Sequence, residues 1–375
     1  MEVVKVKIED GKERYFVADD NGLPIEPILK FIRFKDNTNF ARNTLRMYCQ
    51  HLKLYFEYLQ QRELDFQNVT IDDLALFVNW LQNPYKSLKV IPTHQVEVAR
   101  SPRTVNIIVN TVLAFYDYIL RHEEYSNNIS DRLRKFVSTP SRNFKGFLYG
   151  IAHEQKKVTS NILKLKVPKS KPKTLSKEEI GTLIKTCNNL RDKFLLNLLY
   201  ETGIRIGEAL SLWIEDFDIS DMVIDLQDRG ELENNAEIKT VSSPRRIDIS
   251  QNLADMFMEY IAEYHTEEVE TNHIFIKVSG ANKYKPMNYT DVDNLFRTLK
   301  KVTGIYVTPH MFRHSSLTLL RMAGWQPEIL RIRAGHKNIY TTLNTYIHPS
   351  DEEITKEFNR TRPNLDLDIY NKGDK

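Results

Sequence analysis

A run of lysines and prolines near the middle of the chain constrains the fold most strongly. The stretch KLKVPKSKPKTLSKEE, residues 164–179, contains six lysines and two prolines. Proline lacks the backbone donor that helices and sheets use, and closely spaced lysines repel one another, so this stretch predicts an extended, cationic linker. The 375 residues are enough for two hydrophobic cores. We therefore expect two domains, at 39–160 and 176–350, joined by a linker at 161–175.

The composition excludes several classes of protein. Apolar residues make up 41% of the chain, but charges interrupt every apolar run well before the roughly 20 residues that a membrane-spanning helix needs. The N-terminal stretch MEVVKVKIEDGKERYF carries acidic residues and no apolar signal core. The two cysteines, Cys49 and Cys187, lie in helical patterns and are expected to be reduced core thiols. These features predict a soluble cytoplasmic protein without a membrane partner, and the net charge of +3 alone does not indicate a nucleic-acid partner.

The part of the chain before the linker has a short alternating segment followed by helical patterns. Residues 1–38 alternate apolar and polar side chains around EDGKE and DDNGLP, which predicts a lead-in containing a small hairpin. From Asn43 the apolar residues recur every four positions, as in an amphipathic helix. The stretches TIDD at Thr70 and SPRT at Ser101 are helix-start signals. Residues 39–160 are therefore expected to form a helical domain.

The part after the linker begins with helices, and one of them starts at an arginine. In SKEE, Ser176 and Glu179 have the spacing of a capping box. In LLNLLYETGIRIGEALSLWIEDFD, one helix is expected to end near Thr202–Gly203 and the next to begin around Arg205. A helix N-terminus attracts anions, and an arginine can donate two hydrogen bonds to a phosphate. A surface ion pair between Arg205 and Glu208, one turn apart, would explain the same residues.

The segment MVIDLQDRGELENNAEIKTVSSPRRIDIS alternates like β-strands around an acidic turn. It predicts a β-hairpin or three-stranded sheet at the edge of a helical domain, with Lys239 at a strand end and Arg246 in the returning strand. A lysine on such a hairpin can donate a proton to a departing oxygen. It can equally be one of many solvated lysines.

The stretch TPHMFRHSSL contains two histidines, His310 and His314, four residues apart. They would share one face of a helix, which is the spacing of a zinc pair. The stretch lacks the glutamate of the HExxH motif, and the cationic Arg313 between the histidines would repel a bound metal ion. Zinc is therefore disfavoured, and a structural histidine is the better alternative for His314.

Four sequence boxes follow one another in the second half of the chain: ETGIRIGEALSLWIEDFD, IKTVSSPRRIDI, HMFRHSSLTLLRMAG and AGHKNIYTTLNTYIH. Together they resemble the signature boxes of the tyrosine recombinases, the phage-integrase family. The resemblance is firm from Lys173 to Pro349 and weaker over the helical domain. The sequence departs from the family pattern at Phe312 and Ala334, where leucine is usual.

The resemblance implies roles for seven residues. Arg205 and Arg313 would bind the scissile phosphate, Lys239 would donate a proton to the leaving 5′ oxygen, Glu208 would support the site, His310 would be the acid/base group, His336 would contact the phosphate, and Tyr346 would be the nucleophile. Tyr346 lies ten residues beyond His336, at the long end of the family spacing, whereas Tyr340 lies four residues beyond it. The match of TTLNTYIH to the family motif favours Tyr346 and leaves Tyr340 as the alternative.

The resemblance also implies a fold and an activity. The fold would be mainly α with a small β-sheet in the catalytic domain, and a helical core-type DNA-binding domain would clamp duplex DNA together with that catalytic domain. The enzyme would cut and rejoin DNA through a 3′-phosphotyrosyl intermediate, with no cofactor, metal or ATP. The lysine- and asparagine-rich composition favours the integration, excision or transposition of a bacterial mobile element.

The partners that follow are double-stranded DNA at specific sites, a homotetramer in the synaptic complex, and accessory recombination proteins, with the enzyme in the nucleoid when bound to DNA. The linker lysines expected to contact phosphates are Lys164, Lys166, Lys169, Lys171 and Lys173. The tail at 351–375 would either dock on a neighbouring subunit or fray. Two other functions stay open: a type IB topoisomerase-like relaxing enzyme and a non-catalytic sequence-specific DNA-binding protein.

Overall fold

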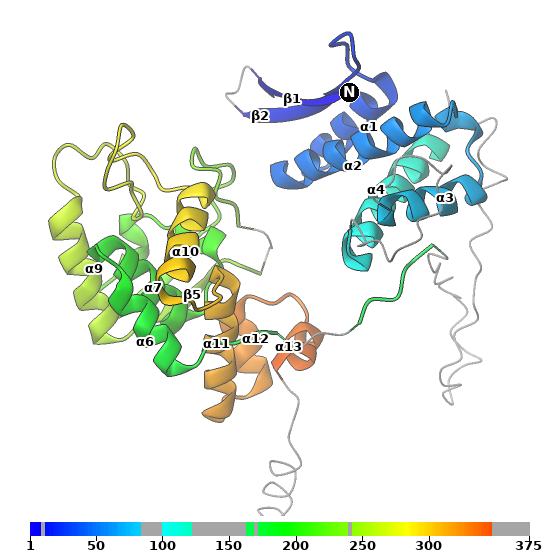
Figure 1. Cartoon of the computed structure of the whole chain (residues 1–375). Helices are drawn as coiled ribbons and strands as arrows, with labels where there is room; N and C mark the ends of the chain where they lie inside the picture. The colour runs from blue at the N-terminus through cyan, green and yellow to red at the C-terminus, as the bar shows by residue number, and fades with distance from the viewer. Residues whose placement is uncertain (9–11, 84–99, 122–162, 169–171, 239–241, 347–375) are drawn as a thin grey trace, which may run out of the picture. The chain divides into compact units, whose positions relative to one another are not determined.

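The computed structural model describes residues 1–8, 12–83, 100–121, 163–168, 172–238 and 242–346, with the backbone alone at 121 and 343–346 (Figure 1). The chain forms two compact units, Met1–Lys169 and Ser170–Lys375. Both are helical with small antiparallel sheets, which confirms the predicted mainly α fold class. None of the helices in these described ranges is long and apolar enough to cross a membrane.

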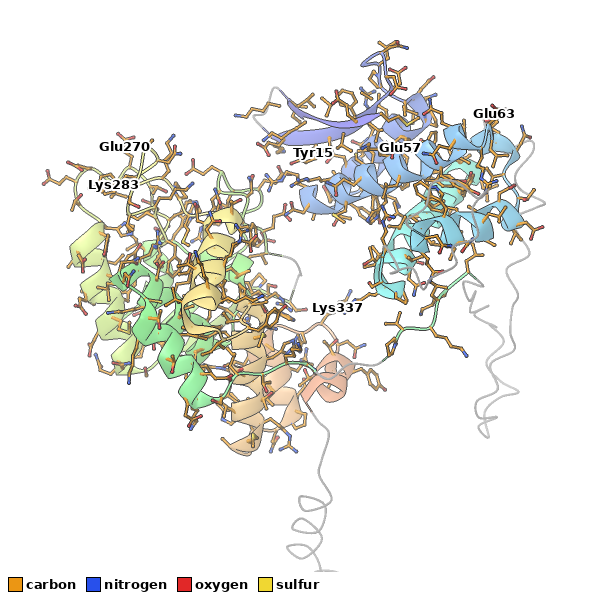
Figure 2. All side chains as sticks on the ribbon, viewed as in Figure 1. Tyr15, Glu57, Glu63, Glu270, Lys283 and Lys337 are labelled. Carbon is orange, nitrogen blue, oxygen red and sulfur yellow. The ribbon has the colours of Figure 1, made fainter. Side chains whose placement is uncertain are left out.

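In its described residues, the first unit pairs a β-hairpin with four helices. The strands are β1 (Glu2–Lys7) and β2 (Glu13–Ala18), and the helices are α1 (Glu26–Asn37), α2 (Arg42–Gln61), α3 (Ile71–Gln82) and α4 (Pro102–Arg121), with a short 3₁₀ turn η1 (Phe66–Asn68) before α3. Strands β1 and β2 lie in the alternating segment for which a small hairpin was predicted. Figure 2 shows Tyr15 on β2 on the side of α2, where the Arg46 guanidinium lies 5.9 Å from its ring. Helix α1 corrects the predicted lead-in at 1–38, because 12 of those residues form a helix whose buried side chains belong to the core of the following helices.

Aromatic side chains form much of this unit's core. Phe31 of α1 meets Phe115 of α4 edge-on, and Tyr55 of α2 meets Phe77 of α3 in the same way, with ring centroids 5.7 and 5.0 Å apart. Edge-to-face contacts of this kind each contribute about 0.5–1.5 kcal/mol beyond the area that they bury. The buried hydroxyl of Tyr55 lies 2.6 Å from that of Tyr116, which satisfies both polar groups. The four helices therefore share one core.

The second unit surrounds a buried central helix. The helices are α6 (Lys177–Thr186), α7 (Leu190–Thr202), α8 (Ile206–Leu210), α9 (Gln251–Tyr264), α10 (Tyr289–Thr303), α11 (Pro309–Met322), α12 (Pro327–Ala334) and α13 (Ile339–Tyr346), and a 3₁₀ turn η3 (Ile214–Asp216) precedes the sheet. Helix α7 packs against α6, α9 and α11. Strands β3 (Phe217–Asp218), β4 (Val223–Leu226) and β5 (Arg245–Asp248) form an antiparallel sheet in that order, which confirms the predicted small β-sheet; β3 precedes the segment from which the sheet was predicted.

Both described ends of the predicted linker are anchored to a unit. Asn106 of α4 donates to the carbonyl of Leu165 (2.9 Å) and accepts from its N–H (2.8 Å), while Leu163 and Leu165 pack on the first unit's core. The alternating Lys164 and Lys166 are exposed. Residues 163–168 form no helix or strand, and they dock on the first unit through Leu163 and Leu165, while Val167 is exposed. Lys169 and Lys171 lie outside the described residues.

At its other end the linker is tied to the second unit. The N–H of the buried Leu175 donates to Ser315 Oγ at 2.7 Å. The exposed Lys173 places its ammonium 5.1 Å from the ring centroid of Tyr306, and Lys300 approaches the same ring at 4.9 Å. Two cations on one exposed ring create a local positive charge at the start of this unit.

Candidate active site

A buried carboxylate, Glu208, organises two arginines at the start of α8. The Arg205 side chain donates to it at 2.8 Å and the Arg205 backbone N–H at 2.9 Å, while Arg245 of β5 donates to both of its oxygens at 3.3 and 3.1 Å. Burial alone would raise the pKa of Glu208, but Arg245 above all, with Arg313 and Arg205, lowers it to about 2. Glu208 is therefore an anion at neutral pH and fixes both guanidinium groups.

Arg313 of α11 lies 1% exposed beside this cluster. Its guanidinium donates to the carbonyl of Gly203 at 2.7 Å and to that of Ala334, and it lies 3.0 Å from Nε2 of His336. Gly203 ends α7 in the left-handed conformation, with φ of 66°, which turns its carbonyl toward α11. Arg313 thus links the end of α7 to the end of α12.

His336 is a neutral histidine whose tautomer follows from its neighbours. An arginine can only donate, so Nε2 accepts from Arg313 and Nδ1 carries the proton, which it donates to Thr342 Oγ1 at 2.9 Å. Burial first, and then Arg313 and Arg205, lower the pKa of His336 to about 3. His336 therefore adds no charge at neutral pH and connects the arginines to helix α13.

Position 346 shares a helix face with Thr342. Residues four apart in a helix lie one turn apart on the same face, whereas residues two apart point about 200° away from each other. Thr342 is fully buried against His336, and Tyr340, two residues earlier, is 66% exposed. The backbone of α13 therefore places Tyr346, rather than Tyr340, on the face toward His336. The structure describes Tyr346 by its backbone alone.

His310 stands one turn before Arg313 on α11 and is exposed. Its ring centroid lies 4.3 Å from that of His314, edge to face. Burial, followed by the influence of His310 and Arg313, lowers the pKa of His314 to about 4. His314 is thus a neutral packing partner of His310. In the described part of the chain, no three His, Cys, Asp or Glu side chains gather into a group that could hold a metal ion.

The structure gathers Arg205, Glu208, Arg313 and His336 into one network and adds Arg245, which the sequence analysis missed. Arg246 lies in the returning strand β5, as predicted, but it is 60% exposed and pairs with Asp221, whereas the Arg245 side chain is 6% exposed. Alternation contained the signal, because Arg245 shares its face of β5 with the buried Ile247. Lys239 lies outside the described residues.

Comparisons with known proteins identify the family. Residues 173–353 match the phage integrase family, and residues 31–91 match the phage integrase N-terminal SAM-like domain. Transposase A from transposon Tn554 of Staphylococcus aureus is 37% identical over 361 residues, which cover 96% of this chain and 98% of that protein. The chain belongs to the phage integrase family, the tyrosine recombinases. These enzymes carry out DNA transesterification, and the relatives place this one in the transposon type.

More distant tyrosine recombinases also align along most of the chain. The recombinase XerD of Staphylococcus epidermidis is 23% identical over 353 residues, covering 90% of this chain and 98% of that protein. The Tn1549 transposon integrase in complex with transposon right-end DNA has a TM-score of 0.59 at 20% identity and covers 90% of this chain and 98% of that one. A lambda integrase dimer bound to a core site gives 0.54 at 12%, covering 87% and 78%. These two structures show a shared fold.

Replacing Glu208 with glutamine is expected to destabilise the second unit. The buried Arg245 and the partly exposed Arg205 would lose their shared anion, a change that typically costs about 3–5 kcal/mol and lowers the melting temperature by roughly 10 °C. The lowered pKa of Glu208 means that this stabilisation is present above its unfolded pKa and is lost as pH falls toward about 2. Thermal melts at pH 7 and pH 3 would test this: the wild type should lose more stability on acidification than the variant. Glu215→Gln, on a 56% exposed carboxylate, is the control and should change little.

Replacing Lys173 with alanine is expected to weaken DNA binding mainly at low salt. If its ammonium contacts a backbone phosphate, its loss should reduce the slope of log K against log salt by about one. Fluorescence anisotropy over a salt series would measure this slope. Lys283→Ala is the matched control, because Lys283 also lies over a tyrosine, Tyr284, at 4.3 Å, on the loop between α9 and α10 (Figure 2). An unchanged slope in Lys173→Ala would contradict the contact.

Proposed function

We propose that this chain is a site-specific DNA recombinase that integrates, excises or transposes a mobile element through a covalent 3′-phosphotyrosyl intermediate. The observation that carries the proposal is the network in which Glu208 and His336 fix Arg205 and Arg313 beside the helix that bears Tyr346. A buried network of this composition is suited to an anion with several oxygens. The relatives named for transposition support the choice of a mobile element.

The charge of the network suits a phosphodiester under nucleophilic attack. A phosphodiester carries one negative charge, and more charge accumulates on its oxygens as a fifth oxygen approaches. Arg205 and Arg313 neutralise that charge, and the protein holds both before DNA binds, so little reorganisation is needed during the reaction. His336 is neutral, and both of its ring nitrogens are used by Arg313 and Thr342, so it holds Arg313 in place without adding charge.

The proposed reaction is a transesterification that balances without an outside reactant. The phenolic oxygen of Tyr346 forms a bond to phosphorus and gives its proton to His310, while the bond from phosphorus to O5′ breaks and Lys239 protonates O5′. The products are a 3′-phosphotyrosyl link and a free 5′ hydroxyl. A second 5′ hydroxyl then reverses these steps on another strand, so the link conserves the bond energy and ATP is not required.

The two units would grip duplex DNA together, with the linker lysines Lys164, Lys166, Lys169, Lys171 and Lys173 along the phosphates. The proposed domains are a lead-in at 1–38, whose helix α1 shares the core of the next domain, a DNA-binding domain at 39–160, a linker at 161–175, a catalytic domain at 176–350 and a tail at 351–375. Four protomers would act on two duplexes, with the tail docked on a neighbour and accessory proteins assisting.

A plasmid assay separates this function from its alternatives. The substrate is a supercoiled plasmid with two copies of the junction formed by the ends of the candidate element, and the control plasmid carries none. We expect deletion or inversion products from the first plasmid only, in EDTA and without ATP. Relaxation of both plasmids without recombinants would favour a topoisomerase-like enzyme. Binding without any strand cleavage would favour a DNA-binding protein.

A further inference from the structure

The segment between β4 and Lys239 is held in place by the buried side-chain amide of Asn234. Asn234 is 5% exposed, and its Nδ2 donates to the carbonyls of Leu210 at 2.9 Å and Met287 at 3.0 Å. Its Oδ1 accepts from the N–H of Ala236, which is fully buried, at 3.0 Å. Residues 234–236 are therefore fixed against the end of α8 and the residue just before the N-cap of α10.

The next contact of this segment falls on Gly207, in the first turn of α8. A methyl group at Gly207 would lie 2.8 Å from the carbonyl oxygen of Glu237 and 2.5 Å from Tyr289 Oη. Tyr289 could move its flexible end away, but the Glu237 oxygen belongs to the backbone and cannot. Gly207 is not among the glycines with positive φ, so it is the close approach, and not the helix conformation, that requires glycine here.

The residues that follow Lys239 in the described chain, Ser242 and Ser243, contact the arginine network. A methyl group at Gly335 would lie 3.0 Å from the carbonyl oxygen of Ser242, and the carbonyl of Ser243 accepts from Arg245, which is itself bound to Glu208. Gly335 also accepts from Arg205 at 3.3 Å through its own carbonyl. Glu237 and Ser242, which flank the part of the chain that contains Lys239, therefore both contact residues of the candidate active site or their direct neighbours.

We infer that Gly207 is a positioning residue for Lys239, because it lets the backbone of Glu237, two residues before the lysine, pack directly against α8. This inference rests on the proposed role of Lys239 as the proton donor. One residue of extended chain spans at most about 3.6 Å, so Cα of Lys239 lies within about 7 Å of Cα of Glu237. A shift of Glu237 therefore moves the point from which the chain continues to Lys239.

The chemistry of the leaving group offers a selective readout. In the normal step the ammonium of Lys239 gives a proton to O5′ as the bond to phosphorus breaks. A DNA strand with sulfur in place of the bridging O5′ expels a thiolate, which is stable enough to leave without a proton. A defect in proton delivery should disappear on this substrate, whereas a defect in the phosphate-binding arginines should remain.

The test compares Gly207→Ala with Gly181→Ala, a helical glycine of α6 with no atom within 4 Å of a built methyl group. Single-turnover cleavage of a nicked duplex carrying the element end is measured with oxygen and with sulfur at the scissile position. We expect Gly207→Ala to cleave the oxygen substrate about 10- to 100-fold more slowly than the wild type, and the sulfur substrate within about threefold. Gly181→Ala should match the wild type on both. Equal losses of Gly207→Ala on both substrates would overturn the inference.

Further variants keep the inference distinct from the proposed function. Lys239→Ala should itself be rescued by sulfur, and a failure there would refute the role of Lys239 rather than that of Gly207. Asn234→Ala loosens the same segment without adding an atom at Gly207 and should show the same selective loss, which decides the question if Gly207→Ala does not fold. Full recovery of oxygen-substrate cleavage in Gly207→Ala combined with Tyr289→Phe would show that the tyrosine, and not the Glu237 backbone, is the obstacle, and would also overturn the inference.

Discussion

Replacing Tyr346 with phenylalanine is expected to abolish covalent capture of DNA while leaving DNA binding intact. The variant keeps the aromatic ring and loses only the oxygen that would join phosphorus, so cleavage should fall by at least about 10⁴-fold. A denaturing gel of a nicked suicide duplex would show a shifted protein-DNA band for the wild type and none for the variant. Anisotropy with the same duplex should give Kd values within about threefold of each other.

The matched control is Tyr340→Phe on the same helix. Tyr340 is 66% exposed, and its position on α13 faces away from Thr342 and His336. We expect this variant to form the covalent band at the wild-type rate. Loss of the band in Tyr340→Phe, with its retention in Tyr346→Phe, would reverse the assignment of the nucleophile.

Replacing Arg313 with lysine is expected to give the second largest effect. The guanidinium of Arg313 bridges the carbonyls of Gly203 and Ala334 and contacts His336, and a single ammonium cannot reproduce that planar arrangement. Loss of one preorganised donor to a developing negative charge typically costs about 10²–10³-fold in rate. Single-turnover cleavage should fall by at least this factor, whereas DNA affinity, which depends on many phosphates, should change by less than about tenfold.

Arg246→Lys is the matched control for this substitution. Arg246 is 60% exposed and its ion pair with Asp221 is on the surface, so the same change of side chain should alter cleavage by no more than about twofold. Circular dichroism of Arg313→Lys would show whether the fold is retained. A folded Arg313→Lys that cleaves at the wild-type rate would remove Arg313 from the proposed phosphate clamp.

Local signals in the sequence predicted the helices well. Thr70 and Ser176 form the expected capping boxes, and Arg205 stands at the N-cap of α8 as predicted. Helix α1 was missed because the alternating residues before it were extended too far, although Ile28, Phe31 and Ile32 have helical spacing and are all buried. Short-range rules therefore recover the starts of α3, α6 and α8.

Contacts between distant residues could not be predicted in the same way. The hydrogen bonds between Asn106 and Leu165 join residues 59 apart, and the ion pair of Glu208 with Arg245 joins residues 37 apart. Such partners depend on how the helices pack and not on any local pattern. The ordered boxes nevertheless identified the family, because each carries a residue type that phosphate chemistry uses, and the comparisons confirmed that assignment.

The most direct test of the central claim is to identify the residue that becomes attached to DNA. The covalent complex formed on the suicide duplex would be digested with nuclease and protease, and the modified peptide sequenced by mass spectrometry. The proposed mechanism predicts a nucleotide joined through phosphate to Tyr346, in the peptide that contains TTLNTYIH. Attachment at Tyr340 or any other residue, or the absence of a modified peptide from a duplex that is cleaved, would contradict it.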